Sequence, residues 1–91
     1  MEISRSAKKE LYNIDKHNQL FIINSLSDFI ENFNDDYEIS LMKKGIIKKL
    51  KGKKETLYRL KLRSYRVIYK KYKDKLVILV LNITTREGAY K

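Results

Sequence analysis

Cationic side chains occupy alternate positions in the segment YRLKLRSYRVIY, residues 58–69. With the two-residue period of a β-strand, Arg59, Lys61 and Arg63 share one face and apolar residues occupy the other. Arg66 follows just past a short turn. Lysine and arginine side chains placed in such a row can hold a phosphate group and stabilise the charge that develops when it is cleaved.

The C-terminal segment TTREGAYK contributes Arg86 and Tyr90. A phenol has an ordinary pKa of about 10, and nearby cations lower this pKa by favouring the phenolate. A tyrosine tuned in this way could take a proton from a ribose 2′-hydroxyl while cations hold the phosphate. Such a site needs no metal, histidine or cofactor. Two alternatives stay open: Tyr90 is a loose packing residue, or Glu87 is the acid–base group.

Charge is distributed unevenly along the chain. Residues 1–42 contain 4 Lys/Arg and 8 Asp/Glu, whereas residues 43–91 contain 17 Lys/Arg and 3 Asp/Glu, in a chain of net charge +10. This asymmetry favours a polyanionic partner, most simply nucleic acid. An acidic protein, an anionic membrane surface or a genomic base bias towards lysine codons are the alternatives.

Length and composition exclude several classes of protein. The 91 residues suit a single domain, residues 1–91. The absence of cysteine excludes disulfides and thiolate zinc sites, and the lone His17 excludes a multi-histidine metal site. The longest apolar run, Leu76–Leu81, is too short to span a membrane, and the N-terminus lacks an apolar signal region. We therefore expect a soluble cytoplasmic protein.

The N-terminal part of the sequence predicts a short strand at residues 2–6 followed by two helices. The first helix is expected to start at Ser6 and to run for about ten residues. Asp15 is the expected N-cap of the second helix. Its apolar residues follow helical spacing and form one wide stripe, namely Ile22, Ile23, Leu26, Phe29, Ile30 and Phe33.

Residues 37–54 give no clear pattern beyond their charge. Seven lysines lie between Lys43 and Lys54, and a short helical or extended piece is bracketed by Gly45 and Gly52. One interpretation is a solvated charged loop. The other is a contact surface for a phosphate backbone.

After Gly52, residues 56–62, 65–72 and 75–83 predict three consecutive strands joined by short turns. Helices followed by an antiparallel meander predict an α+β fold of two layers, with the N-terminal strand and helical hairpin packed on an antiparallel sheet.

The expected first turn, at Arg63–Ser64, pairs apolar residues with apolar residues and places Lys61 directly opposite Arg66. Like charges in this position destabilise a sheet, so we expect an anion to lie across them. Solvation, or pairing with Glu55 and Glu87, is the alternative.

The second turn, around residues 73–74, is expected to place Arg66 near Leu81 and Ile68 near Leu79. The resulting mixture of cationic and apolar surface suits a single-stranded nucleic acid.

The run from Leu50 to Tyr90 closely resembles the C-terminal half of toxins of the RelE/ParE superfamily. The resemblance rests on a Leu-Lys-Gly turn, a Tyr-Arg-Leu-Lys strand, a Tyr-Arg-Val-Ile-Tyr strand, a hydrophobic strand, and a final Arg and Tyr. With the preceding helical hairpin and N-terminal strand, it extends over nearly the whole chain. It implies a RelE-like fold and a toxin of a toxin–antitoxin system.

The resemblance to the RelE-like branch also implies roles for particular residues. Lys61 and Arg66 would stabilise the scissile phosphate, Arg86 would be a general acid or phosphate clamp, and Tyr90 the general base. RNA-binding positions would be Lys48, Lys49, Lys51, Lys53, Lys54, Arg59 and Arg63. The implied partners are an antitoxin with an acidic segment and the ribosomal A site carrying mRNA.

Three functions are compatible with this sequence. The first is a metal-independent, ribosome-dependent mRNA endonuclease, favoured by the joint presence of Lys61, Arg66, Arg86 and Tyr90. The second is a ParE-like inhibitor of DNA gyrase without nuclease activity. The third is an inactive relative that only binds an antitoxin.

Overall fold

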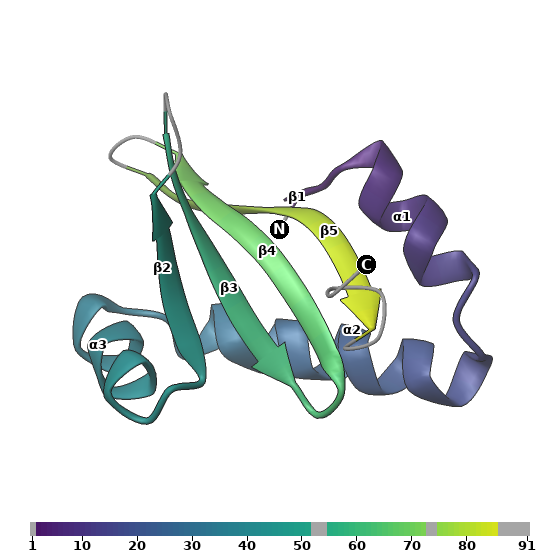
Figure 1. Ribbon diagram of the computed structural model, residues 1–91, viewed down its shortest axis with the longest axis horizontal. Coiled ribbons are helices and arrows are strands. Elements are labelled where there is room, and N and C mark those ends of the chain that lie inside the picture. Colours follow the sequence, from purple (N-terminus) through teal and green to yellow (C-terminus); the bar gives the residue numbers. More distant parts are fainter. Residues whose placement is uncertain (1, 52–54, 73–74, 86–91) are drawn as a thin grey trace.

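Three helices pack on one face of a five-stranded sheet in the computed structural model, which describes residues 2–51, 55–72 and 75–85 (Figure 1). The strand order is β1-β5-β4-β3-β2, and β1 runs parallel to β5 while the other pairs are antiparallel. The two-layer α+β architecture is thus as predicted, although β1 makes the sheet mixed. The elements are β1 (Glu2–Ile3), α1 (Arg5–Tyr12), α2 (Lys16–Glu31), α3 (Asp35–Lys43), β2 (Ile47–Lys51), β3 (Thr56–Leu62), β4 (Tyr65–Tyr72) and β5 (Lys75–Thr85).

Polar side chains define where each helix begins. Ser4, Asp15 and Asn34 each accept a hydrogen bond from the backbone N–H three residues later, at 3.2, 3.1 and 2.8 Å. These bonds satisfy N–H groups that have no partner within the helix. The expected cap at Asp15 is confirmed. The expected start of the first helix at Ser6 is wrong, because Ser4 supplies the cap and α1 begins at Arg5.

The segment that the sequence left undecided forms both a helix and a strand. Helix α3 carries three acidic residues in its first turn, where the helix dipole favours negative charge. Gly45 ends it with a φ of 77°, a conformation that glycine adopts without strain. Lys48, Lys49 and Lys51 then lie in strand β2, so the interpretation of this stretch as a charged loop is wrong for these three lysines.

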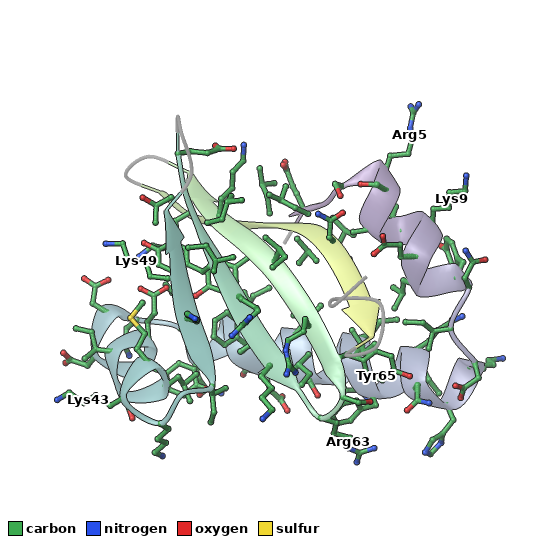
Figure 2. The ribbon with its side chains drawn as sticks, in the orientation of Figure 1. Arg5, Lys9, Lys43, Lys49, Arg63 and Tyr65 are labelled. Atoms are coloured by element: carbon green, nitrogen blue, oxygen red, sulfur yellow. The ribbon has the colours of Figure 1, made fainter. Side chains whose placement is uncertain are left out.

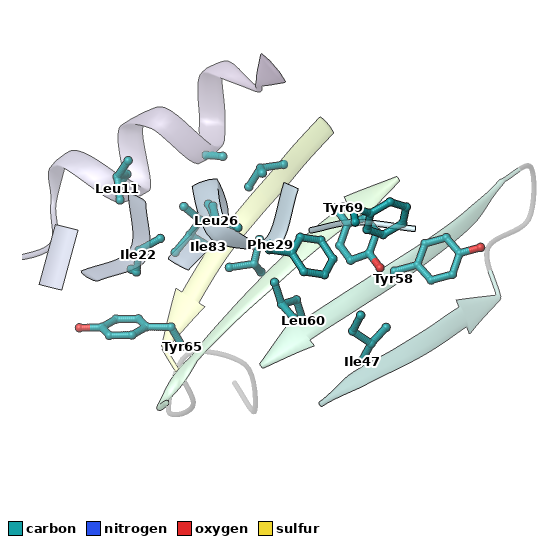
Figure 3. Close-up of a cluster of buried hydrophobic side chains, with 14 residues drawn as sticks. Leu11, Ile22, Leu26, Phe29, Ile47, Tyr58, Leu60, Tyr65, Tyr69 and Ile83 are labelled. Carbon is teal, nitrogen blue, oxygen red and sulfur yellow. The ribbon is translucent and has the colours of Figure 1, made fainter. Parts of the chain in front are cut away.

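The core lies between the helices and the inner face of the sheet (Figure 3). Ile22, Leu26, Phe29 and Phe33 of the predicted helical stripe are buried, whereas Ile23 is 38% exposed. None of the described helices is both long and apolar enough to cross a membrane. The buried hydrophobic residues are Ala7, Leu11, Ile22, Leu26, Phe29, Phe33, Ile47, Tyr58, Leu60, Tyr65, Val67, Tyr69, Val80 and Ile83.

Two irregularities shift the pairing of β4 with β5. The pair Tyr72–Lys75 has the register expected for a turn at residues 73–74, but shifts follow at Lys71/Tyr72 and at Ile68/Tyr69. Arg66 therefore lies opposite Thr84, three residues from the expected position. Extra residues of this kind bend a strand and increase its twist. The prediction that Arg66 lies near Leu81 and Ile68 near Leu79 is therefore wrong.

Candidate nucleic-acid interface

The hairpin of β3 and β4 brings two cations together, as the sequence predicted. Lys61 lies directly opposite Arg66, and Leu60 lies opposite Val67. The amide of Lys61 donates to the carbonyl of Ile46 at 2.9 Å, on the side away from β4. Lys61 and Arg66 therefore form a non-hydrogen-bonded pair, the type in which facing side chains lie nearest to each other. Two like charges thus occupy one of the closest cross-strand positions of the hairpin.

Neighbouring strands extend this pair into a larger cationic surface. Arg59 lies opposite Lys48 of β2 on one side and Ile68 of β4 on the other. Lys48 and Lys61 are exposed, and Arg59 is partly exposed. We call Lys48, Arg59, Lys61 and Arg66 the cationic face. It lies on the side of the sheet opposite to the helices, because the residues that alternate with these four, such as Leu60 and Val67, are buried in the core.

Described carboxylates do not neutralise this face. Glu55 instead binds Lys70 at 3.2 Å, and Glu38 binds Lys71 at 2.8 Å. These are the ion pairs formed among the side chains that the structure describes, those of residues 2–50, 55–71 and 79–83, and no group of three potential metal ligands occurs among them either. The predicted alternative of pairing with Glu55 is therefore wrong for these four cations, because Glu55 pairs with Lys70, a different lysine on the same side of the sheet.

Arg66 is buried although it belongs to the cationic face. It is 9% exposed, and among the described residues its guanidinium makes one long hydrogen bond, from Nη1 to the carbonyl of Tyr65 at 3.5 Å. A guanidinium carries five N–H donors in a planar fork that matches phosphate oxygens. Arg66 therefore carries N–H donors of a kind that suits phosphate oxygens, and its burial restricts the orientation of the side chain.

Arg63 takes a different direction from the other cations of the hairpin. It is a turn residue with a φ of 55°, and its guanidinium carbon lies 3.9 Å from the ring centroid of Phe21 in α2 (Figure 2). A left-handed backbone costs a non-glycine residue ~1–2 kcal/mol. A cation over an aromatic ring at an exposed site returns ~0.5–1 kcal/mol. The side chain of Arg63 thus contacts the helix layer and does not continue the cationic face.

The remaining predicted site residues either do not belong to the cationic face or lie outside the residues that the structure describes. Lys49 lies opposite Tyr58, whose side chain is in the core, so Lys49 is on the helix side of an edge strand (Figure 2). Lys51 is the last residue of β2. Lys53, Lys54, Arg86, Glu87 and Tyr90 lie outside the described residues.

A second cluster of charged residues lies on the inner face of the sheet and was not anticipated. Glu38 is 4% exposed and accepts hydrogen bonds from the hydroxyl of Tyr69 and the Nζ of Lys71, both at 2.8 Å. Lys71 also lies 4.8 Å from the ring centroid of Tyr58. A signal was available, because the period of β4 places Lys71 on the same face as Tyr69. A lysine on a buried face requires a carboxylate partner.

The pKa values of this inner cluster follow from its burial and pairing. Burial, the hydrogen bond to Glu38 and the charge of Glu38 all raise the pKa of Tyr69. Burial acts to lower the pKa of Lys71, but the hydrogen bond and charge of Glu38 outweigh it, so this pKa is raised from its ordinary value. The raised pKa values keep the phenol of Tyr69 neutral and the amine of Lys71 protonated beside Glu38.

Comparison with known proteins identifies relatives of the same architecture. A family model described as the ParE toxin of the type II toxin–antitoxin system parDE matches residues 1–90. The archaeal RelE–RelB complex from Pyrococcus horikoshii OT3 contains a similar chain, with 25% identity, a TM-score of 0.68, and coverage of 93% of this chain and 91% of that chain.

Two Escherichia coli structures are also similar. The intact RelBE toxin–antitoxin complex gives 22% identity, a TM-score of 0.64 and coverage of 92% of both chains. The isolated RelE toxin gives 20% identity, a TM-score of 0.63, and coverage of 98% of this chain and 92% of that chain. A search of curated protein sequences gives no match.

Proposed function

The chain belongs to the ParE toxin family, within the RelE/ParE superfamily of type II toxin–antitoxin toxins, and from this premise we propose that it is a metal-independent endoribonuclease that cleaves ribosome-bound mRNA. The fold supports this proposal, because the similar structures are those of RelE toxins. The cationic face supports it further, because it gathers four cations on the side of the sheet opposite to the helices, and three of them are exposed or partly exposed.

The proposed reaction is an attack of a ribose 2′-oxygen on the adjacent phosphorus. The new bond gives a 2′,3′-cyclic phosphate, the P–O5′ bond breaks, and the leaving oxygen takes a proton to become a 5′-hydroxyl. Lys61 and Arg66 bind the non-bridging oxygens, where negative charge grows in the transition state. By resemblance, Tyr90 accepts the 2′-proton and Arg86 protonates or clamps the leaving group. Arg59 and Lys48 hold the flanking RNA backbone.

The observation that carries the proposal is the close pair of Lys61 and Arg66. Like charges in facing positions of a sheet reduce its stability, and described carboxylates do not compensate for them. A phosphate bound across the pair removes this repulsion. The arrangement is thus unfavourable for the free protein and favourable for a complex with RNA.

Such a toxin requires a neutralising partner. RelE from Pyrococcus horikoshii and RelE from E. coli were each crystallised with RelB. We propose a cognate antitoxin with an acidic segment that folds over the basic half of this chain, in the cytoplasm where ribosomes are available.

The second candidate function is inhibition of DNA gyrase, and the ParE family model is the observation that favours it. A gyrase inhibitor would not need Tyr90 or the cationic pair, and its induction would damage DNA while leaving mRNA intact. The two functions therefore differ in which nucleic acid is broken after induction.

The decisive experiment maps the 5′ ends of a defined mRNA in a translating extract, with the wild-type protein, Arg66→Ala and Arg86→Ala. We expect codon-spaced cuts that require translation and disappear in both variants, which should also lose growth arrest while staying folded. Lys70→Gln is the matched control, because Lys70 lies on the same strand but is paired with Glu55. Intact mRNA with wild-type protein, or full toxicity of a stably expressed Arg66→Ala/Arg86→Ala double variant, would reject the nuclease; a gyrase supercoiling assay would then follow.

A further inference from the structure

We propose that Arg63 does not bind RNA but is a positioning residue, which clamps the turn of the β3–β4 hairpin to Phe21 of α2 and so holds the Lys61–Arg66 pair in place. The expected effect of Arg63 on cleavage rests on the proposed function. The contact between the turn and the helix, on which the structural part of the inference is based, does not depend on that function.

The direction of the side chain is the first observation. From sequence periodicity alone, Arg63 would extend the row of Arg59 and Lys61. In the structure the guanidinium carbon instead lies 3.9 Å from the ring centroid of Phe21, a residue of helix α2. Phe21 is itself partly buried and packed against the core, so the ring is a fixed surface. An arginine held over a ring on the helix side is not directed at a ligand on the cationic face.

The backbone of the turn is the second observation. Arg63 is the one non-glycine residue of the described ranges with a positive φ, at 55°. Glycine or asparagine would adopt this conformation with less strain. An arginine at this position has more backbone strain than glycine or asparagine would have, but its side chain is long enough to reach Phe21. The choice of arginine therefore favours the contact between the turn and α2 over a turn with less strain.

The position of the turn gives the clamp its consequence. Leu62 and Tyr65 close the turn, and Lys61 and Arg66 form the next pair of the ladder. A hairpin end that separates from α2 would allow these two side chains to move apart, and a displacement of about 1 Å at a reacting group can greatly reduce a rate. Clamping the turn opposes the like-charge repulsion at the neighbouring pair.

The test combines one measurement on the free protein with two on its function, for Phe21→Leu, Arg63→Gln and the double variant. Amide hydrogen exchange of Tyr65 reports opening of the turn. The salt dependence of binding to a 2′-O-methyl RNA oligonucleotide reports phosphate contacts, because each phosphate neutralised on a single strand changes the logarithmic slope by about 0.7. Codon-spaced cleavage in the translating extract reports the rate. Arg59→Gln, which removes a cation of the cationic face, is the matched control.

If Arg63 is a clamp, both single variants speed exchange at Tyr65 and slow cleavage by about fivefold. The double variant is no worse than either single variant, and the salt slope stays at the wild-type value while Arg59→Gln reduces it. If Arg63→Gln reduces the slope as Arg59→Gln does and Phe21→Leu has no effect, Arg63 is an RNA ligand and the proposal is wrong. Absence of cleavage by the wild-type protein would instead reject the nuclease, and the exchange and slope measurements would still decide the role of Arg63.

Discussion

Strand β4 carries two basic residues, Lys71 and Arg66, that lie on opposite faces of the sheet and in different environments. On the inner face, Lys71 is bound to the buried carboxylate of Glu38, which also accepts a hydrogen bond from Tyr69. On the outer face, Arg66 is 9% exposed and faces another cation, Lys61. The inner charge is compensated within the fold, whereas the described residues leave the outer one uncompensated. The difference separates a charge that is paired within the fold from one that, on the proposed function, is available to bind a phosphate.

Removing an outer cation should impair function most. Arg66→Gln is expected to reduce mRNA cleavage by about 10²–10³-fold, the usual effect of losing one group that stabilises a developing oxyanion. The urea midpoint should stay near the wild-type value, because Gln retains most of the side-chain volume and one repulsive charge is gone. Cleavage in the translating extract and urea unfolding check the two parts. Loss of the fold together with activity would show that Arg66 is a structural residue like Lys71.

Removing the inner carboxylate should impair stability most. Glu38→Ala leaves Lys71 and the hydroxyl of Tyr69 without their partner, and we expect a loss of about 3 kcal/mol in the free energy of unfolding. Glu55→Ala is the control, because Glu55 is 53% exposed in its pair with Lys70 and such pairs contribute less than ~1 kcal/mol. Equal shifts of the urea midpoint in the two variants would remove the distinction between the buried and the exposed pair.

The inner cluster should also make stability fall at high pH. The pKa of Tyr69 is raised above its ordinary value of 10.0, and the pKa of Lys71 is raised above 10.5. Above these values the unfolded chain releases two protons that the native state retains, so stability decreases as the pH rises. Urea midpoints between pH 8 and pH 11 should show this decrease, and Tyr69→Phe should make it shallower. An unchanged slope in Tyr69→Phe would contradict the assignment to Tyr69.

The smallest expected effect is a gain in stability. Lys61→Gln removes the repulsion with Arg66 and should raise the free energy of unfolding by a few tenths of a kcal/mol, within the ~0.2–1 kcal/mol range of cross-strand pairs. The gain should shrink as salt is added, because salt screens the repulsion that is relieved. Thermal unfolding at low and high ionic strength provides the measurement. If Lys61→Gln lowers the free energy of unfolding at low salt, a favourable interaction of Lys61 outweighs its repulsion with Arg66, and the expectation is wrong.

The parts of the fold that follow local periodicity were predictable from sequence. Alternation of apolar and cationic residues supported the β3–β4 register set by a turn at residues 63–64, because a one-residue shift would place Val67 opposite Arg59 or Lys61. The same argument identified Lys61 and Arg66 as neighbours. Asp15 was recognisable because its cap precedes a clear helical stripe.

The parts that depend on tertiary contacts were not predictable. Asn34 and the acidic residues after it suggested the end of a helix, although they also begin a new one, and only the packing of α3 decides between these roles. The two register shifts of β5 have no local signal in a strand that is apolar on both faces. The direction of Arg63 depended on an aromatic ring 42 positions earlier in the chain.

The strand order has a consequence for synthesis of the protein. Strand β5 is made last among the described strands, yet it lies between β1 and β4. Until it emerges, β1 has no neighbour, and Glu10 of α1 lacks the amide of Ile83 that it binds at 2.7 Å. At that stage the sheet of the nascent chain consists only of β2, β3 and β4, because β5 is needed to join β1 to β4. On the proposed function, a ribosome making this protein would be protected from it until β5 has been made and has joined the sheet.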